Sequence, residues 1–221
     1  MRLEAIVSDF SANTTNGPIK FYDYAADSWV VLFSHPADFT PVCTTELGRM
    51  AARYSEFKRQ NVKLLALSCD PLQTHADWVN DIKSYYTDIP ADFPYPIICD
   101  ESRELAVRLD MLNGADRQDP ETAVTVRALY IIDPNKKLRL SMLYPTTIGR
   151  NIDEILRVIT ALQLHDRLKV IATPVDWTPG EKIMILPEAT NEETCEIFPS
   201  GSIHSVSMPS GKDYLRTATK Y

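Results

Sequence analysis

The chain has 221 residues, of which 44% are hydrophobic and 24% are charged, and its formal net charge is −7. This length allows one large domain, or one core domain with a small appendage, and the composition excludes disorder on a large scale. The acidic balance argues against a nucleic acid or an anionic membrane as a partner of the whole protein.

The first residues contain acidic side chains and no apolar run long enough for a signal peptide. No window elsewhere in the chain approaches the length of a membrane-spanning helix. We therefore expect a cytoplasmic protein without a membrane span.

Short apolar runs alternate with helical patterns along the first three quarters of the chain. In chain order we expect a buried strand at 30–33, a helix from 43 to about 60, a strand at 62–68, a helix from 71 to about 86 that is opened by Pro71, a strand at 95–99, and a short helix at 102–109 capped by Ser102.

A β-hairpin and a long helix follow. The stretches 124–132 and 138–144 flank the turn signal Asp133-Pro134-Asn135. Asn151 is expected to cap a helix with an apolar face. This order predicts an α/β layered domain with a mixed sheet, spanning residues 1–165. The proline-rich residues 166–221 predict a small β-rich C-terminal domain or arm that packs on the first domain or on a partner subunit.

The four cysteines are widely spaced, and none forms a C-x-x-C pair or a zinc-binding pattern. We expect free thiols. Cys69 and Cys99 each end a buried strand, where a cysteine behaves as a small hydrophobic residue. Cys195 lies among acidic residues in the C-terminal segment, and whether it takes part in chemistry is left open.

Cys43 has a different setting, between a buried strand and a helix. Thr40 is a good N-cap candidate, which puts Pro41 at the first helical position and Cys43 in the first turn. Free backbone N–H groups at a helix start favour the thiolate form of a cysteine, which is the nucleophile. The Thr40 hydroxyl can accept one hydrogen bond and donate another to the sulfur or to a substrate oxygen. An isolated cysteine would instead be interpreted as a packed apolar residue.

The pattern Pro36-x-x-x-Thr40-x-x-Cys43 resembles the P-x-x-x-T-x-x-C signature of peroxiredoxins. The longer string from Ser34 to Leu47 is similar to the 1-Cys subfamily, the peroxiredoxin-six class of animals. Three further strings, at 143–151, 172–177 and 209–216, also resemble that class, so the similarity covers nearly the whole chain.

This resemblance implies a thioredoxin-like fold and the reduction of hydrogen peroxide and of organic, including lipid, hydroperoxides. It assigns the peroxidatic role to Cys43, with Thr40 and Arg127 assisting. On its own, Arg127 would be interpreted as a solvated charge at a strand edge. Pro36 is expected to shield the site, with His35 and Glu46 as supporting neighbours. No cofactor is implied, and a metal role for His35 is not expected because no partner lies at ligand spacing.

In the 1-Cys class an external thiol, usually glutathione, reduces the sulfenic acid that Cys43 forms. The class forms homodimers through a sheet edge, and the strand at 138–144 is our candidate for that edge. A resolving role for Cys195 stays open. A scaffolding oligomer with a vestigial thiol and a general thiol–disulfide exchanger are the competing hypotheses, and the latter lacks C-x-x-C.

Some members of the class are credited with a phospholipase activity at a serine with histidine and acid partners. Here Ser28 lacks the flanking glycines, and Tyr22 and Asn135 stand at the positions of the histidine and the acid. A serine without a base is not activated. We expect this second activity to be absent or very weak.

Overall fold

The computed structural model describes residues 1–114, 123–219 and 221. The chain forms two compact units, Met1–Ile152 and Asp153–Tyr221. The expected boundary at residue 165 lies near the other end of the helix that opens the second unit. No helix in the described part of the chain is long and apolar enough to cross a bilayer.

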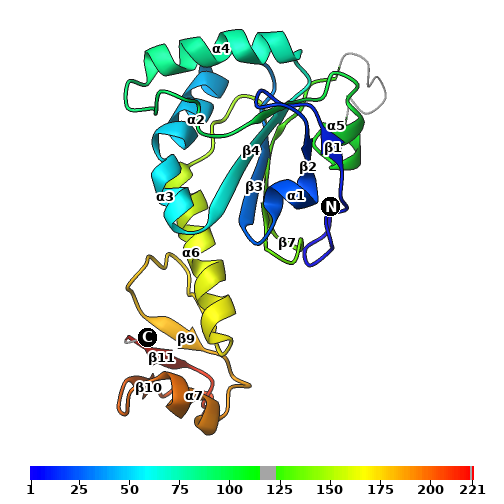
Figure 1. Ribbon diagram of the computed structural model, residues 1–221. Coiled ribbons are helices and arrows are strands. Elements are labelled where there is room, and N and C mark those ends of the chain that lie inside the picture. Colours follow the sequence, from blue (N-terminus) through cyan, green and yellow to red (C-terminus); the bar gives the residue numbers. More distant parts are fainter. Residues whose placement is uncertain (115–122, 220) are drawn as a thin grey trace. The chain divides into compact units, whose positions relative to one another are not determined.

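A five-stranded mixed sheet forms the centre of the first unit (Figure 1). Its strand order is β5 (Ile97–Cys99), β4 (Val62–Ser68), β3 (Trp29–Ser34), β6 (Arg127–Ile132) and β7 (Leu138–Tyr144). The first three are parallel, and the β6–β7 hairpin is antiparallel to β3. The α/β architecture with a mixed sheet is therefore confirmed, and β7 is an edge strand.

Helices cover both faces of this sheet (Figure 1). On one side lie α2 (Pro41–Ala52), α3 (Tyr54–Arg59) and α4 (Leu72–Tyr85); on the other lie α1 (Phe21–Ala25), α5 (Glu104–Arg108) and the small pair β1 (Ser11–Ala12) and β2 (Ile19–Lys20). Alternate residues of the strands, such as Val30 and Leu32, pack with Phe21 of α1 and Ala106 of α5 in one buried cluster. In a layered domain of this kind, the carboxyl ends of the parallel strands lie at one edge of the sheet, and the loops at that edge can hold catalytic residues.

Two helix predictions need correction. The single helix expected from 43 to about 60 is broken at Arg53, which leaves the helical conformation (φ −95°, ψ 11°), ends α2 and begins α3. The break lets Phe57 reach the core, where it is fully buried. Ser102 makes only one long contact with α5, in which its hydroxyl oxygen accepts the N–H of Glu104 at 3.4 Å. Asp100 is the main cap, because its two carboxylate oxygens accept the N–H groups of Leu105 and Ala106 at 3.2 and 2.7 Å.

The hairpin is confirmed, but its first strand is shorter than expected. It begins at Arg127 and not at residue 124. Thr125 is held elsewhere: it forms an isolated bridge with Leu112, and its hydroxyl donates to the carbonyl of His35 at 2.6 Å. Arg127 is thus the first residue of its strand.

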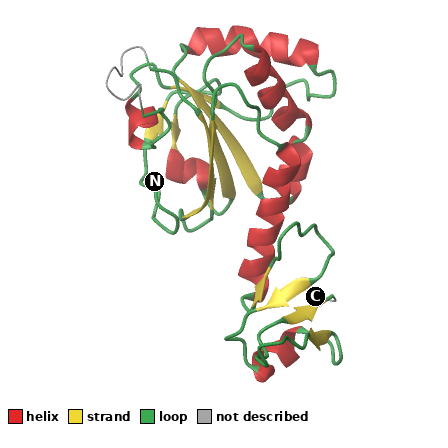
Figure 2. Cartoon of the chain, turned by 180° about the vertical axis from the view of Figure 1, so that it is seen from behind, coloured by secondary structure: helices red, strands yellow, loops and turns green. Residues whose placement is uncertain are grey.

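The second unit is built on the long helix α6 (Ile152–Leu168). A four-stranded antiparallel sheet follows, in the order β10 (Ile203–Ser205), β11 (Arg216–Ala218), β9 (Ile183–Ile185) and β8 (Ile171–Ala172), together with the short helix α7 (Asn191–Ile197). Figure 2 shows these strands in yellow around the C-terminus. Trp177, Ile183 and Phe198 are buried in its own apolar cluster. The segment is β-rich, as expected.

Candidate active site

Cys43 lies in the first turn of α2, directly after the loop that leaves β3. Thr40 is extended (φ −114°, ψ 146°) at the N-cap position, and Pro41 opens the helix. This is the local geometry that the sequence predicted, because proline at the first position loses no helical hydrogen bond. The Cys43 side chain is fully buried. The backbone N–H groups of this first turn have no hydrogen-bond acceptor within the helix.

Arg127 meets Cys43 from the start of β6. Its Nη1 donates to Cys43 Sγ at 3.3 Å and to Glu46 Oε2 at 2.8 Å. Its Nε and Nη2 both donate to the carbonyl of Thr146, at 3.0 and 2.6 Å. The side chain is almost fully buried, so the alternative of a solvated strand-edge charge is wrong. The contact places a fixed cation directly beside the sulfur.

Glu46 lies one helical turn after Cys43 and pairs with two arginines. Besides Arg127, it accepts three hydrogen bonds from Arg150: from the backbone N–H and Nε to Oε1 at 2.6 and 2.9 Å, and from Nη2 to Oε2 at 2.8 Å. Arg150 also donates to the carbonyl of Ala128 at 2.7 Å and stacks over the ring of Phe33. Glu46 therefore fixes the orientation of Arg127 towards the sulfur.

The ionisation of Glu46 follows from this network. Burial on its own would raise the pKa of the Glu46 carboxyl, but the charge and hydrogen bonds of Arg150 and the charge of Arg127 outweigh it. The pKa of Glu46 therefore lies below its ordinary value. The site holds two cations and one carboxylate beside Cys43, an excess of positive charge.

Arg150 is a site residue that our sequence reasoning did not single out. It is buried in the loop after β7. No periodic pattern or motif spacing in the sequence distinguishes it from the other arginines. The one available signal is its position within the string at 143–151 that resembles the 1-Cys class.

Thr40 makes different contacts from those expected. Its hydroxyl donates to the carbonyl of Ala37 at 2.8 Å and not to the sulfur. Its only proton is thereby used, so towards an incoming substrate the oxygen presents acceptor lone pairs. Pro36, on the same loop, is partly buried.

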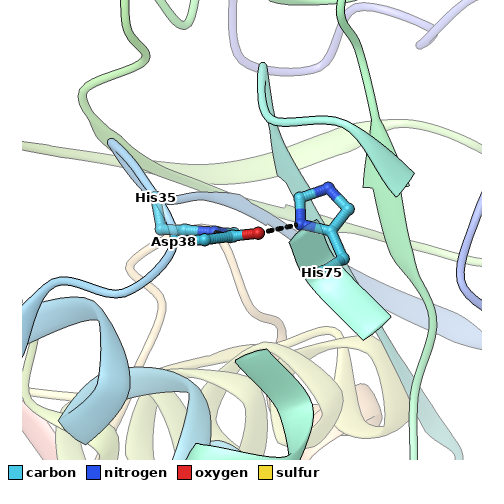
Figure 3. A group of neighbouring side chains, drawn as sticks. All are labelled: His35, Asp38 and His75. Carbon is cyan, nitrogen blue, oxygen red and sulfur yellow. Dashed lines mark hydrogen bonds and ion pairs between the residues drawn. The ribbon is translucent and has the colours of Figure 1, made fainter. Parts of the chain in front are cut away.

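His35 belongs to a buried cluster with Asp38 and His75 (Figure 3). The two carboxylate oxygens of Asp38 lie 2.8 Å from His35 Nε2 and 2.6 Å from His75 Nδ1. The other ring nitrogen of His75 is 3.2 Å from the carbonyl of Ile98. The cluster fastens the loop before Cys43 to α4 and to β5.

Burial lowers the pKa of His35 despite the neighbouring Asp38 carboxylate, so the ring is neutral. Burial would raise the pKa of Asp38, but its hydrogen bonds to His35 and His75 outweigh this and lower it. His35 has no partner at ligand spacing in the sequence, but the fold brings one to it, because His75 lies on α4. Both oxygens of Asp38 are nevertheless engaged in hydrogen bonds, so the cluster reads as a structural support.

The other three cysteines differ clearly from Cys43. Cys69 is buried at the end of β4, where burial first and the Asp100 charge second raise the pKa of its thiol to about 11. Burial and the charge of Glu101 also raise the pKa of Cys99. Cys195 is an exposed thiol on α7. Among these described thiols, only that of Cys43 accepts a hydrogen bond from Arg127.

Comparison with known proteins agrees with this geometry. Residues 4–141 match the model of the AhpC/TSA family, and residues 161–200 match that of the C-terminal domain of 1-Cys peroxiredoxin. The chain belongs to the peroxiredoxin family. The peroxiredoxin-6 of Bos taurus is 52% identical over 209 residues, covering 94% of this chain and 92% of the bovine protein. That of Homo sapiens is 50% identical over 212 residues, covering 96% and 94%.

Solved structures of peroxiredoxins share the whole fold. A cysteine-to-serine mutant of the peroxiredoxin 6 of Arenicola marina matches with a TM-score of 0.93 at 48% identity, covering 100% of this chain and 99% of that one. A yeast mitochondrial 1-Cys peroxiredoxin matches with a TM-score of 0.86 at 41% identity over the full length of both. The chain thus has the thioredoxin-like fold, belongs to the 1-Cys class and is a thiol-dependent peroxidase.

Proposed function

We propose that this peroxidase acts through Cys43 on hydrogen peroxide and on alkyl and lipid hydroperoxides. The Cys43 thiolate attacks one peroxide oxygen, the O–O bond breaks, and the other oxygen leaves as water or an alcohol after taking up a proton. Cys43 becomes a sulfenic acid. The observation that carries this proposal is the hydrogen bond of 3.3 Å from Arg127 Nη1 to Cys43 Sγ.

The neighbouring residues have separate roles in this step. Arg127 stabilises the thiolate and the negative charge that develops on the leaving oxygen. Thr40, whose own proton is bound to Ala37, accepts a hydrogen bond from the peroxide. Glu46 orients Arg127, while Pro36 shields the sulfur from water. His35 supports the loop through Asp38.

An external thiol completes the cycle. The thiol attacks the sulfenic sulfur of Cys43, a mixed disulfide forms and water leaves; a second thiol then releases Cys43. The yeast mitochondrial 1-Cys peroxiredoxin has its thiol resolved by glutathione and thioredoxin systems. We propose glutathione as the reductant here. Excess peroxide is expected to drive Cys43 to sulfinic and sulfonic acid and to end its activity.

The test is peptide-mass analysis after one equivalent of peroxide in the presence of a sulfenic-acid trap. We expect the trap on Cys43 and no disulfide, and Cys43→Ser should abolish peroxide consumption while keeping the fold. Cys195→Ser is the matched control and should still be trapped at Cys43. An unmodified Cys43 would refute the proposal, and a Cys43–Cys195 disulfide would make the enzyme functionally 2-Cys.

We also propose a homodimer formed at the β7 edge, in the cytoplasm, with no nucleic-acid partner. The support for the dimer is the edge position of β7, which the N-terminal segment covers at Leu138, together with the exposed Leu143 farther along the strand. The support for the location is that the four cysteines are free thiols, as is usual in a reducing compartment. Cell fractionation with antibody detection tests the location, and recovery in an organelle fraction would contradict it.

Lipid hydrolysis at Ser28 is a second candidate activity that we expect to be absent or very weak. The Ser28 side chain is buried, and its hydroxyl donates to Asn61 Oδ1 at 3.0 Å. An amide oxygen is not a general base. Robust phospholipid hydrolysis that disappears in Ser28→Ala would overturn this expectation.

A further inference from the structure

The second unit contains a cavity of about 470 Å³ that belongs to no part of the peroxidase site. It is formed by α7, by the turn that follows it, and by β10 and β11. Figure 1 shows these elements together near the C-terminus. The cavity has the size of sites that bind small molecules. Three of its lining residues carry chemistry: Cys195, Asp213 and Arg216.

The guanidinium group of Arg216 is held in place by hydrogen bonds, but not all of its nitrogens have a hydrogen-bond partner in the described part of the chain. Its Nη2 donates to the carbonyls of Leu186 and Ala189 at 2.8 and 2.9 Å, which fixes the guanidinium plane. Its Nε is buried and has no partner among the described residues. Unpaired buried donors are rare in proteins, and this one belongs to a group that pairs well with carboxylates. Arg216 lines the cavity, and its planar guanidinium is the kind of group that pairs with a carboxylate there.

Cys195 brings an exposed thiol to the same cavity. It lies on α7 among acidic residues, but the carboxylate of Glu193 is engaged at the start of that helix. There it accepts the N–H of Thr190 at 2.9 Å, while Thr190 Oγ1 accepts the N–H of Glu193. Asp213 is the one carboxylate among the described residues that line the cavity. The cavity thus combines a thiol, a cation and an anion.

We propose that this cavity binds a small carboxylate-bearing disulfide of the glutathione type, which exchanges with the thiol of Cys195. A tripeptide disulfide of this class carries carboxylates for Arg216, an ammonium group for Asp213 and a disulfide for Cys195. The proposal rests on the proposed function in one respect: the peroxidase cycle with glutathione generates this disulfide as its product.

The exchange is balanced without any further reactant. The Cys195 thiol loses its proton, and the thiolate attacks one sulfur of the disulfide. The disulfide's S–S bond breaks as the bond from Cys195 Sγ to that sulfur forms. The other half leaves as a thiolate and takes up a proton. Cys195 is oxidised to a mixed disulfide, the departing thiol is reduced, and excess free thiol reverses the reaction.

The test uses the full chain with Cys43→Ser, so that the peroxidase site cannot react. Glutathione disulfide and its tetraethyl ester, which lacks the carboxylates, are compared by the rate at which Cys195 is modified, followed by peptide mass. The same chain unfolded in urea is the reference for this rate ratio, because it lacks the cavity. In the unfolded chain, the acidic residues next to Cys195 in sequence repel the anionic disulfide. We expect folding to raise the acid-to-ester rate ratio by at least about tenfold, the value of one charge-assisted hydrogen bond.

An equal ratio in the folded and unfolded chains would overturn the proposal. Arg216→Lys keeps the charge but loses the planar fork, and it should reduce the ratio towards the unfolded value. Arg216 also donates to two carbonyl groups, so Trp177 fluorescence is used to check that the Arg216→Lys variant is folded. The comparison of acid and ester in the folded and unfolded Cys43→Ser chain tests the proposal even if this variant does not fold. Failure of sulfenic-acid trapping at Cys43 in the natural sequence would refute the proposed function and leave the exchange at Cys195 intact.

Discussion

Arg127 illustrates how one side chain can serve both the fold and the chemistry. The three nitrogens of its side chain all donate hydrogen bonds, and Nη1 donates both to the Cys43 sulfur and to Glu46. We predict that Arg127→Gln slows sulfenic-acid formation at Cys43 by roughly 10²- to 10³-fold, the range for loss of one preorganised donor. Stopped-flow measurement with hydrogen peroxide tests this. Arg139→Gln, a change to an arginine on β7 that pairs with Asp133, is the control and should react at the normal rate.

Glu46 should make stability depend on pH. Its pKa in the folded chain is below the ordinary value of 4.5, so its ionised form stabilises the fold above that pH and the contribution is lost as pH falls through the folded pKa. Glu46→Gln leaves two buried arginines uncompensated, which should cost about 3–5 kcal/mol near neutral pH.

Denaturant unfolding of both forms over a pH series is the measurement. The gap between natural chain and variant should be largest near neutral pH and shrink as pH falls below 4.5. A gap that does not change with pH would mean that the Glu46 charge is not what stabilises the site.

The residues of the site were predictable to different degrees. Cys43, Thr40 and Pro41 form a local pattern, so helix-start chemistry alone placed them. Arg127 is far away in sequence and required the resemblance to known proteins. His75 and Arg150 could not be found from spacing, because a tertiary contact between separate elements is what gives each of them its role.

At the scale of elements, the start of α5 shows a competition between two cap candidates. Ser102 fits the local pattern, but Asp100 accepts the two N–H groups. We predict that Asp100→Ala lowers the free energy of unfolding by about 1–2 kcal/mol, the usual value of an N-cap. Ser102→Ala is the matched control and should change it by much less. Urea titration distinguishes the two, and the reverse order would restore Ser102 as the cap.

Strands were easier to predict than the ends of helices. The strand expected at 62–68 coincides with β4, because a continuous buried run has clear limits. The late start of β6 reflects a contact with a distant residue, the Thr125 hydroxyl bound to the His35 carbonyl. The break at Arg53 accompanies the burial of Phe57, which depends on the tertiary core. The two-residue strands β1 and β2 are too short to leave a periodic signal.

At the scale of the whole molecule, the proposed dimer makes a direct prediction. Leu143 is 62% exposed on the edge strand β7. A charge at this position would have to be buried in a paired edge, so Leu143→Glu should yield monomers in sedimentation velocity. Val107→Glu, at a site on α5 that is 54% exposed, is the control and should keep the assembly of the natural chain. A natural chain that is monomeric at micromolar concentration would contradict the proposal.

The position of Arg127 in the β6–β7 hairpin has a further consequence. Arg127 is in register with Tyr144 at the end of β7, and its guanidinium holds the carbonyl of Thr146 two residues later. The edge strand and the residue that donates a hydrogen bond to the sulfur therefore move as one piece of backbone. A second chain that stiffens this edge would also narrow the range of angles at which the guanidinium meets the thiolate, so the reactivity of each active site would report on whether its subunit is assembled.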